Sequence, residues 1–452
     1  MSWTKEKIYD LLCQSKRSCT LGLFIGSGFS KAVSNGLMPG WKELLQRVSS
    51  IMKIDDSVFN QGYPYPTIAS EICRLYSLNN EGVSRKDAER IFKYHIASQV
   101  NEPVNEKQKE RFSILSSLSP NWIVTTNYDF IIESVLSDHT LPINPDDSYI
   151  KTGDFIPVYH IHGSIADPDS IVITNEDYTQ TLRVADYRHA RLPFLIKEST
   201  VLMIGYSLND INVLSAVDYS KNVYTNKPPY YDTPIIQLVY SEKPRLDPYV
   251  TDQGIVVLEI SDICVFLQGF IERDIEYQNE VKETQKKIQE LIACFTDASP
   301  KQIALFLDDA NFRKNAITKI TQLPCEYWYI FSSFVSFINR SLGELWYKAY
   351  QPQAFLYYRD ILRVVLDLIE YTQYDKVPIP YIDSIVDWFC EIAPRVGDEL
   401  GQSFDAMRLF EKRSKSIPQA FIIEFEKRPY INSKYTQAAE LLKNRLCDNN
   451  DG

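Results

Sequence analysis

The sequence predicts an α/β protein in which a doubly wound parallel sheet is followed by an all-α C-terminal domain. Two observations lead to this prediction. Short apolar segments alternate with stretches of helical periodicity through roughly the first 275 residues, as expected for strands joined by crossover helices. Beyond Asp274 the strand-like segments fade and amphipathic helical patterns take over. We therefore expect two domains, residues 1–275 and 276–452.

Seven apolar segments are candidates for the strands of the sheet. They are Leu21–Ile25, Trp122–Thr125, Val158–His160, Ile171–Ile173, Val201–Ile204, Ile235–Tyr240 and Ile255–Ile260. Helical periodicity fills several of the gaps between them. This alternation implies a parallel sheet with helices on both faces.

The second domain is expected to begin with a mixed-charge amphipathic helix, EYQNEVKETQKKIQELIACF. Aromatic residues are dense in the helix-rich region that follows, among them Trp328, Trp346, Tyr357, Tyr358, Trp388 and Phe389. We interpret these residues as the core of a helical domain, with a partner-facing surface as the alternative. No fixed-period repeat indicates a solenoid.

The composition disfavours several classes of protein. The chain has 452 residues, 44% of them hydrophobic, which is enough for two or three domains with a sizeable core. No apolar run approaches the ~20 residues of a membrane helix, and the N-terminal segment lacks the apolar stretch of a signal peptide. A net charge of −11 argues against a surface devoted to the nucleic-acid backbone. We expect a soluble protein that binds no membrane and does not bind nucleic acid directly.

The eight cysteines form no C-x-x-C pair, and no histidines cluster. This spacing suggests neither a disulfide framework nor a zinc site. A reducing cytoplasm therefore fits best, and no metal is expected.

The first candidate site is the segment LGLFIGSGFSKAV, residues 21–33, in which a strand leads into a glycine-containing turn. Gly26 and Gly28 would let the backbone approach an anion closely, and the start of the next helix would offer N–H groups. Ser27 and Ser30 could add hydroxyl donors. The third glycine of a dinucleotide-binding G-x-G-x-x-G motif is missing, so an ordinary tight turn is the alternative.

Polar residues also follow a second apolar strand, in the segment NWIVTTNYDFIIESVL, residues 121–136. Between this strand and an amphipathic helix lie Thr125, Thr126, Asn127 and Asp129. In a doubly wound sheet, such positions lie at the carboxyl ends of strands, where ligands bind. The alternative is that Asn127 or Asp129 caps the helix.

Two histidines mark the third candidate site, in the segment YHIHG. The strand pattern places His160 and His162 on the same face before Gly163 ends it. A metal site is disfavoured because no third ligand lies nearby. We expect His162 to be a base or a hydrogen-bonding group, and His160 to be a supporting, partly buried residue.

The fourth candidate site is the segment TVLMIGYSLNDINVLSAV, residues 200–217. Its strand ends in Gly205, Tyr206 and Ser207 before a helix. Ser207 and Asp210 are candidate ligand-binding residues, with capping of that helix as the alternative. Four strand ends with small and polar residues at one edge of one sheet together describe a nucleotide cleft.

The order of these motifs resembles that of the sirtuin superfamily. The sirtuin pattern G-A-G-x-S is similar to Gly26–Ser30, T-Q-N-x-D to Thr125–Asp129, H-G to His162–Gly163, and G-T-S-L to Gly205–Leu208. The resemblance covers about residues 20–275. It implies a Rossmann-like fold and NAD as the bound nucleotide.

The chain also departs from typical sirtuin deacylases. It has no four-cysteine zinc module between Gly163 and Gly205, and Thr126 replaces the glutamine of T-Q-N. The segment LMPGWKELL stands where those enzymes have P-D-F-R. Together with NEDY, residues 175–178, these features are similar to the sirtuin-like domains of prokaryotic anti-phage defence proteins, which usually hydrolyse NAD.

The resemblance implies a role for each site residue. The turn Gly26–Ser30 would hold the pyrophosphate of NAD, and Ser207 would contact its adenosine side. Asn127 would position water or the ribose, and His162 would engage the ribose hydroxyls and act as general base. Asp129 would hold the nicotinamide amide or order Asn127. The implied nucleotide-binding set also includes Thr126, Gly205 and Asp210.

As a whole, the resemblance implies an NAD hydrolase that acts in anti-phage defence by depleting NAD. The helical domain would serve sensing or assembly, as a homo-oligomer or with a second defence protein such as an ATPase or a nucleic-acid sensor. One alternative is an NAD-dependent transferase or deacylase, and another is a non-catalytic nucleotide-sensing module. The missing zinc module argues against deacylation, and the presence of both Asn127 and His162 argues against binding alone.

Overall fold

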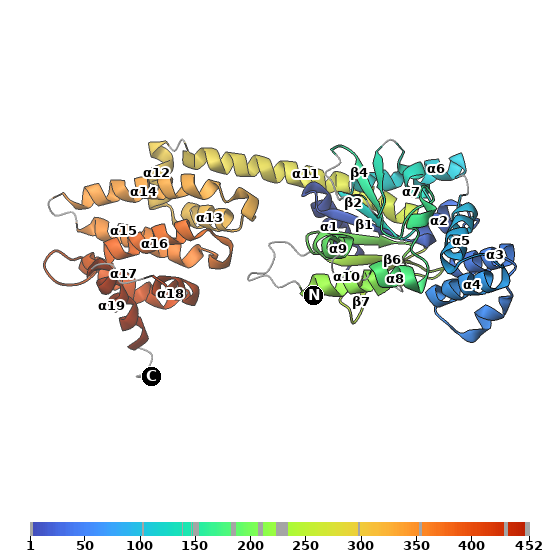
Figure 1. Cartoon of the computed structure of the whole chain (residues 1–452). Coiled ribbons are helices and arrows are strands. Elements are labelled where there is room, and N and C mark those ends of the chain that lie inside the picture. Colours follow the sequence, from blue (N-terminus) through green and yellow to red (C-terminus); the bar gives the residue numbers. More distant parts are fainter. Residues whose placement is uncertain are drawn as a thin grey trace. The chain divides into compact units, whose positions relative to one another are not determined.

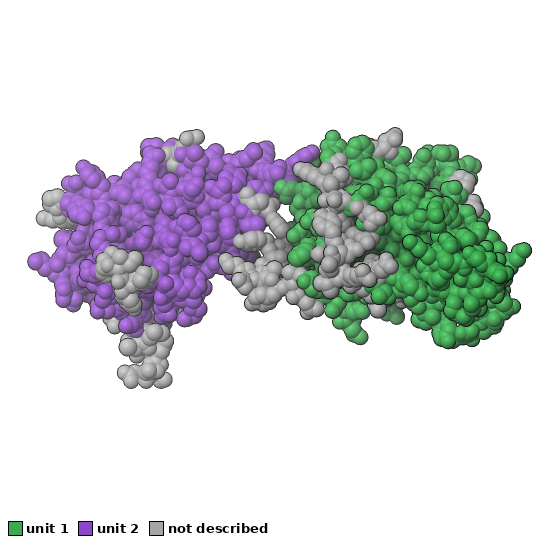
Figure 2. Space-filling model, viewed as in Figure 1, with its two compact units in different colours: residues 1–280 green, residues 281–452 purple. Residues whose placement is uncertain are grey.

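A computed structural model gives the fold as two compact units, residues 1–280 and residues 281–452 (Figure 2). It describes residues 3–101, 104–137, 139–145, 147, 153–181, 187–206, 211–222, 234–296, 299–351, 355–428 and 433–447. The boundary between the units falls inside one helix, α11 (Ile263–Thr296), and the predicted domain boundary at residue 275 falls in the same helix.

The first unit is built on an eight-stranded sheet (Figure 1). Its strands are β1 (Leu21–Ile25), β2 (Trp122–Thr125), β3 (Thr140–Ile143), β4 (Ile156–His160), β5 (Thr200–Ile204), β6 (Ile235–Tyr240), β7 (Tyr249–Val250) and β8 (Val256–Ile260). Their order is β3-β4-β2-β1-β5-β6-β8-β7, and every pair is parallel except β7 with β8. The predicted doubly wound α/β fold is thereby confirmed.

Helices connect and cover these strands. They are α1 (Lys5–Arg17), α2 (Ser27–Val33), α3 (Trp41–Ile51), α4 (Tyr65–Asn79), α5 (Arg85–Gln99), α6 (Glu106–Phe112), α7 (Ile131–Leu136), α8 (Asn175–Thr181), α9 (Tyr187–Lys197), α10 (Ile211–Asn222) and the first part of α11. Among the helices in the described part of the chain, none has the length and apolar character needed to cross a membrane.

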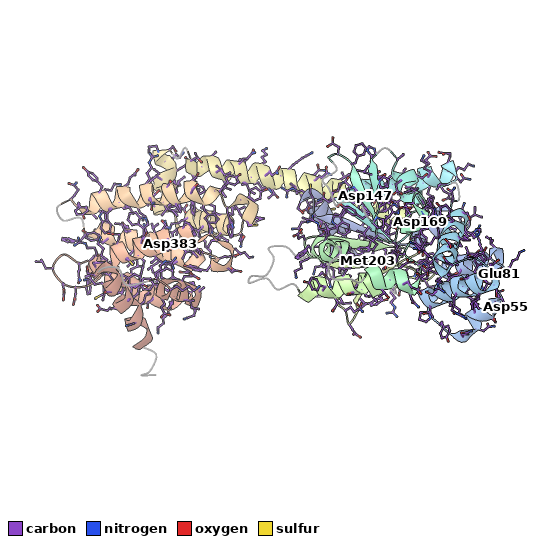
Figure 3. All side chains as sticks on the ribbon, in the orientation of Figure 1. Asp55, Glu81, Asp147, Asp169, Met203 and Asp383 are labelled. Carbon is purple, nitrogen blue, oxygen red and sulfur yellow. The ribbon has the colours of Figure 1, made fainter. Side chains whose placement is uncertain are left out.

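Successive side chains of a strand point to opposite faces of the sheet, so each face has its own core. Leu23 and Ile25 pack with residues of α1, α7 and α11 on one face, whereas Phe24 packs with residues of α9 and α10 on the other. Met203, in the central strand β5, is fully buried on this second face (Figure 3). Because both faces are covered, the central strands are mostly apolar, with only single polar residues such as Thr125, Thr200 and Gln237 in them.

The structure corrects one predicted strand. Ile171–Ile173 is buried but irregular, because its backbone bonds go elsewhere: Val172 N–H donates to the His162 carbonyl, and Ile173 N–H to the Asp177 carboxylate. A short apolar run in the sequence is compatible both with a strand and with a buried irregular segment such as this one. Strands β3 and β7 were not predicted, since both are short, partly exposed and lie at the sheet edges.

The second unit is helical, as predicted. After the end of α11 it contains α12 (Pro300–Asp308), α13 (Ala310–Thr321), α14 (Ile330–Ala349), α15 (Leu356–Tyr371), α16 (Ile379–Ile392), α17 (Phe404–Arg413), α18 (Gln419–Glu426) and α19 (Ser433–Cys447). Asp383, on α16, lies in this unit (Figure 3). The aromatic residues predicted to form its core divide into two groups. Tyr358 and Phe389 are buried, whereas Trp328, Trp346, Tyr357 and Trp388 are partly buried against the core.

Candidate functional site

The four predicted strand ends lie side by side along one edge of the sheet. Ile25 pairs with Thr125 on one side and with Ile204 on the other, and Thr125 pairs with His160. The chain moves outward from β1 through β2 and then returns to the other side of β1 at β5, so β1 and β5 form a topological switch point. Ligands of open α/β sheets bind at the carboxyl edge beside such a point.

At the switch point, the glycines of two turns pack backbone against backbone. Gly26 N–H donates to the Ile204 carbonyl (2.9 Å), and Gly28 N–H donates to the Gly205 carbonyl (2.9 Å). A Cβ at Gly26 would lie 2.5 Å from the Gly205 oxygen, and one at Gly205, whose φ is +62°, would lie 2.2 Å from the Phe29 nitrogen. These glycines are therefore needed for contact between the β1–α2 and β5–α10 turns, a reason that the sequence analysis did not give.

The two serines of the first turn differ in what they contact. Ser27 is exposed, whereas Ser30 is buried and forms part of a hydrogen-bonded chain. Asn127 Nδ2 donates to Ser30 Oγ (2.8 Å), and Ser30 Oγ donates to Asp129 Oδ1 (3.1 Å). The single hydrogen of the Ser30 hydroxyl is thus used by Asp129, so in this arrangement Ser30 does not offer a hydroxyl donor to an anion.

This chain of bonds fixes the orientation of the Asn127 amide. Because Ser30 gives its hydrogen to a carboxylate, its oxygen must accept from Asn127, and the NH₂ end of that amide must face Ser30. Asn127 N–H donates to Thr125 Oγ1 (3.0 Å), and the Asn127 carbonyl contacts His160 Nδ1 (3.1 Å). Three of the four polar groups of Asn127 are therefore bonded within the protein. Among the described residues, Asn127 Oδ1 has no hydrogen-bond donor and remains available to accept one.

Asp129 combines the two roles weighed from the sequence. Its Oδ1 accepts the Ile131 N–H (3.0 Å) at the start of α7, which is a capping contact, and it also anchors Ser30. Burial raises the pKa of Asp129 from 3.8 to about 6, although the bonds from Ile131 and Ser30 and the nearby His160 act in the opposite direction. Through Ser30, Asp129 helps to order Asn127.

The two histidines occupy different environments, which corrects the prediction that they share a strand face. Strand β4 ends at His160, and Gly163 N–H closes a turn onto the His160 carbonyl (3.0 Å), so His162 lies beyond the strand. His160 is completely buried rather than partly buried. Its Nε2 lies 2.7 Å from Glu133 Oε1, a partner that the sequence analysis did not identify.

His162 is held by the segment that returns from the turn. Its ring lies edge-on to Tyr178, with ring centroids 5.4 Å apart at an interplanar angle of 71°. Tyr178 belongs to α8, which begins with the NEDY segment. The tyrosine of the NEDY segment thus packs against His162, the predicted base.

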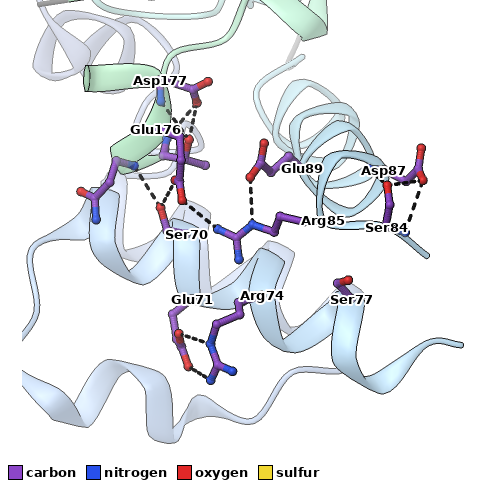
Figure 4. A network of polar contacts seen from close by, with 12 residues as sticks. Ser70, Glu71, Arg74, Ser77, Ser84, Arg85, Asp87, Glu89, Glu176 and Asp177 are labelled. Atoms are coloured by element: carbon purple, nitrogen blue, oxygen red, sulfur yellow. Dashed lines mark hydrogen bonds and ion pairs between the residues drawn. The ribbon is translucent and has the colours of Figure 1, made fainter. Parts of the chain in front are cut away.

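Helix α8 is tied to α4 and α5 by the residues that precede Tyr178 (Figure 4). Glu176 accepts from Ser70 Oγ (2.6 Å) and from Arg85 (3.2 Å). Asp177 pairs with Lys93 Nζ (2.7 Å), and both of these side chains are largely buried. The position of the His162 ring therefore depends on contacts with helices that lie outside the strand-end motifs.

Three further predicted residues complete the set. Thr126 is half-buried directly after β2. Ser207 and Asp210 lie outside the described residues, so their predicted roles stay predictions. The structure brings Ser30, Asn127 and Asp129 together directly, and it brings Gly26 and Gly28 against Gly205.

The fold and the arrangement of its strand ends are those of a Rossmann-type α/β domain. Residues 121–258 match the family described as the SIR2-like domain. This range includes β2 to β7 and the first part of β8, with Asn127, Asp129 and His162. The predicted resemblance to sirtuin-like domains is therefore confirmed for residues 121–258, a range that does not include the turn Gly26–Ser30.

Three curated relatives, each named NAD(+) hydrolase ThsA, are similar to part of this chain. The relative from Acinetobacter baumannii (strain 532279) is 27% identical over 211 residues, which is 45% of this chain and 40% of that protein. The relative from Cytobacillus dafuensis is 26% identical over 218 residues, 46% of this chain and 40% of that protein. The relative from Enterococcus faecium is 27% identical over 200 residues, 42% of this chain and 38% of that protein. The match thus spans about two fifths of each relative's length.

Proposed function

We propose that this protein is an NAD⁺ hydrolase, which cleaves NAD⁺ to nicotinamide and ADP-ribose. Two independent observations support the proposal. Relatives named NAD(+) hydrolase match part of the chain, and the first unit has the SIR2-like fold. The residues at the switch point of the sheet, where ligands of such folds bind, include the acceptor and the base that we propose for hydrolysis.

The orientation of the Asn127 amide is the observation that carries the proposal. The residue is buried, its main chain and its NH₂ group are bonded within the protein, and Oδ1 remains as an acceptor. An acceptor held in this way can take a hydrogen from a water molecule and direct the water lone pair at an electrophilic carbon. A transferase would need to admit a second substrate at the same position.

The proposed reaction is attack of that water on C1′ of the nicotinamide ribose. The C1′–N bond breaks and its electron pair leaves with nicotinamide, while a C1′–O bond forms. His162 is proposed to accept the proton that the water loses, with its ring held against Tyr178. The turn from Gly26 to Ser30, with Thr126, Gly205, Ser207 and Asp210, is proposed to hold the rest of the dinucleotide.

The biological role that we propose is defence against phages by depletion of cellular NAD. The second unit is proposed to regulate the first by sensing infection or by assembly, either as a homo-oligomer or with a second defence protein. Activity would be low until a trigger arrives, since constant hydrolysis of NAD⁺ would harm the host. We expect this to take place in the cytoplasm.

The test is to follow NAD⁺, nicotinamide and ADP-ribose in bacteria that express the full chain and are infected with a panel of phages. We expect NAD⁺ to fall and ADP-ribose to rise in infected cells, and both changes to be absent with His162→Ala. Labelled ADP-ribose attached to protein instead of free would identify a transferase. Protection from phage with constant NAD⁺ would contradict hydrolysis.

A further inference from the structure

The contacts of His160 constrain where its protons lie. Nδ1 faces the Asn127 carbonyl oxygen at 3.1 Å, and Nε2 faces the Glu133 carboxyl at 2.7 Å. A carbonyl oxygen can only accept, so Nδ1 must carry a proton. If that were the only proton on the ring, Nε2 would present a lone pair to an ionised carboxylate, which has lone pairs alone.

We propose that His160 and Glu133 hold one further proton between Nε2 and Oε1, and that this proton-bearing pair fixes the main chain of Asn127. The proton can reside on the ring or on the carboxyl, and both arrangements give the same two hydrogen bonds. Glu133 thereby becomes a positioning residue for the hydrolysis proposed above. It acts through His160 on Asn127 and touches no substrate.

Burial explains why the arrangement is needed. His160 is completely buried, and only 14% of the Glu133 side chain is exposed. The second oxygen of Glu133 is buried and has no hydrogen-bond partner among the described residues. Burying an ionised carboxylate without a bonded proton would cost free energy here. The nearby Asp129 carboxylate would increase this cost by repulsion between like charges.

The ring of His160 is also held on its face. Phe130 lies edge-on to it, with centroids 5.3 Å apart at 73°. Phe130 comes directly before α7, the helix that carries Glu133. The imidazole is thus held at both nitrogens and against its face, and the Nδ1–H bond has one direction, toward the Asn127 carbonyl. Loss of the Glu133 contact would leave Nε2 unpaired and the ring less constrained.

The first test observes the protons directly, on the full chain labelled with ¹⁵N-histidine. The chain has only five histidines, and His160→Gln assigns the resonances. We expect two slowly exchanging downfield protons at His160 in the wild type. In Glu133→Gln the glutamine N–H replaces the shared proton, so the Nδ1 proton should remain and the second resonance should disappear. Absence of the second proton in the wild type would overturn the proposal.

The second test compares two substitutions of Glu133 with a control on the same helix. Glu133→Gln can still bond Nε2, and we expect kcat for NAD⁺ hydrolysis within about threefold of the wild type. Glu133→Leu cannot, and we expect at least a tenfold loss of kcat with KM little changed, because the pair orients Asn127 and does not bind NAD⁺. Ser134→Ala should match the wild type. Equal kcat in Glu133→Leu and the wild type would overturn the positioning role.

The two tests separate this inference from the proposed function. Thermal unfolding of each variant first shows that the fold is retained. A wild type that hydrolyses no NAD⁺ under any trigger would contradict the proposed function, while the resonances would still decide whether the shared proton exists. If the wild type is active and only Glu133→Leu loses kcat, the result supports both the proposed function and the positioning role of Glu133.

Discussion

The two units bury charged and polar side chains in different ways. In the second unit, Arg313 is completely buried on α13 and pairs with Asp367 on α15 (2.5 Å), while it also donates to the carbonyls of Phe306 and Leu307. Arg413 on α17 bonds the other oxygen of Asp367 (2.7 Å). Each of these charges has an opposite charge beside it, so the network joins three helices.

In the first unit, the buried polar residues at the strand ends are matched less completely. The Ser30–Asp129 chain and the His160–Glu133 pair use most of their donors and acceptors, but Asn127 Oδ1 and Glu133 Oε2 have no hydrogen-bond donor among the described residues. The comparison teaches that burial of polar residues does not by itself mark a site.

The largest effect is expected from breaking the network of the second unit. Asp367→Ala removes the partner of Arg313 and leaves a buried uncompensated charge, so we expect a loss of about 3–5 kcal/mol in the free energy of unfolding. Asp360, on the same helix, pairs with Arg359 near the surface, and Asp360→Ala should cost about 1 kcal/mol or less. Urea denaturation measures both. Equal costs would contradict the structural role of the buried network.

The next largest effect concerns Asn127, whose Oδ1 has no hydrogen-bond donor among the described residues. Asn127→Ala should lower NAD⁺ hydrolysis about 100- to 1,000-fold, because the oriented acceptor is lost, while thermal stability changes little. Asn121, at the opposite end of the same strand segment, provides the matched control, and Asn121→Ala should stay active. Steady-state release of nicotinamide is the measurement. Comparable activity in the two variants would contradict the assignment.

A third effect follows from the burial of Asp129. Its pKa is about 6 in the folded protein against an ordinary value of 3.8, so between these values the folded protein binds more protons than the unfolded chain. The contribution of Asp129 to the free energy of unfolding therefore falls as pH rises through this window, by roughly 3 kcal/mol for a pKa difference of this size. Asp129→Asn keeps the acceptor for Ser30 but does not titrate, so it should lack this decline.

Denaturant unfolding of both proteins at pH 4 and pH 6.5 measures the difference. The wild type should lose stability relative to Asp129→Asn over this interval. Parallel curves would show that the Asp129 carboxyl has the same pKa in the folded and unfolded states. Asp129→Ala, which cannot accept from Ser30, should lower NAD⁺ hydrolysis more than Asp129→Asn does.

The smallest effect is expected at the support of His162. Lys93→Met removes the ion pair with Asp177 on α8 and loosens the helix that carries Tyr178. We expect about a tenfold fall in kcat with KM unchanged, since the change displaces the base and not the dinucleotide. Arg85→Met disturbs the more exposed pair with Glu176 and should have little effect. Equal kinetics in the two variants would contradict a role of the Lys93 pair.

The sequence predicted the central part of the fold well, for a physical reason. Strands covered on both faces are mostly apolar runs, and Gly26 and Gly205 stand directly after β1 and β5, where these runs end. The same reasoning failed for Ile171–Ile173, which is apolar because it is buried and irregular because its amides bond His162 and Asp177. Glu133 was missed, since a glutamate on an amphipathic helix is usually a solvated residue.

By itself, the sequence determined that the residues following β1, β2, β4 and β5 gather at one edge of the sheet. Parallel strands all present their carboxyl ends at one edge of a sheet, so a motif that follows each strand is brought to the others by topology alone. The tertiary structure decided which donors and acceptors are used up. The partners that decide this, such as Ser30 with Asp129 and His160 with Asn127, are 99 and 33 residues apart in the chain. Hydrogen bonds depend on direction and distance in space, and no local pattern of residues encodes which acceptor is left over.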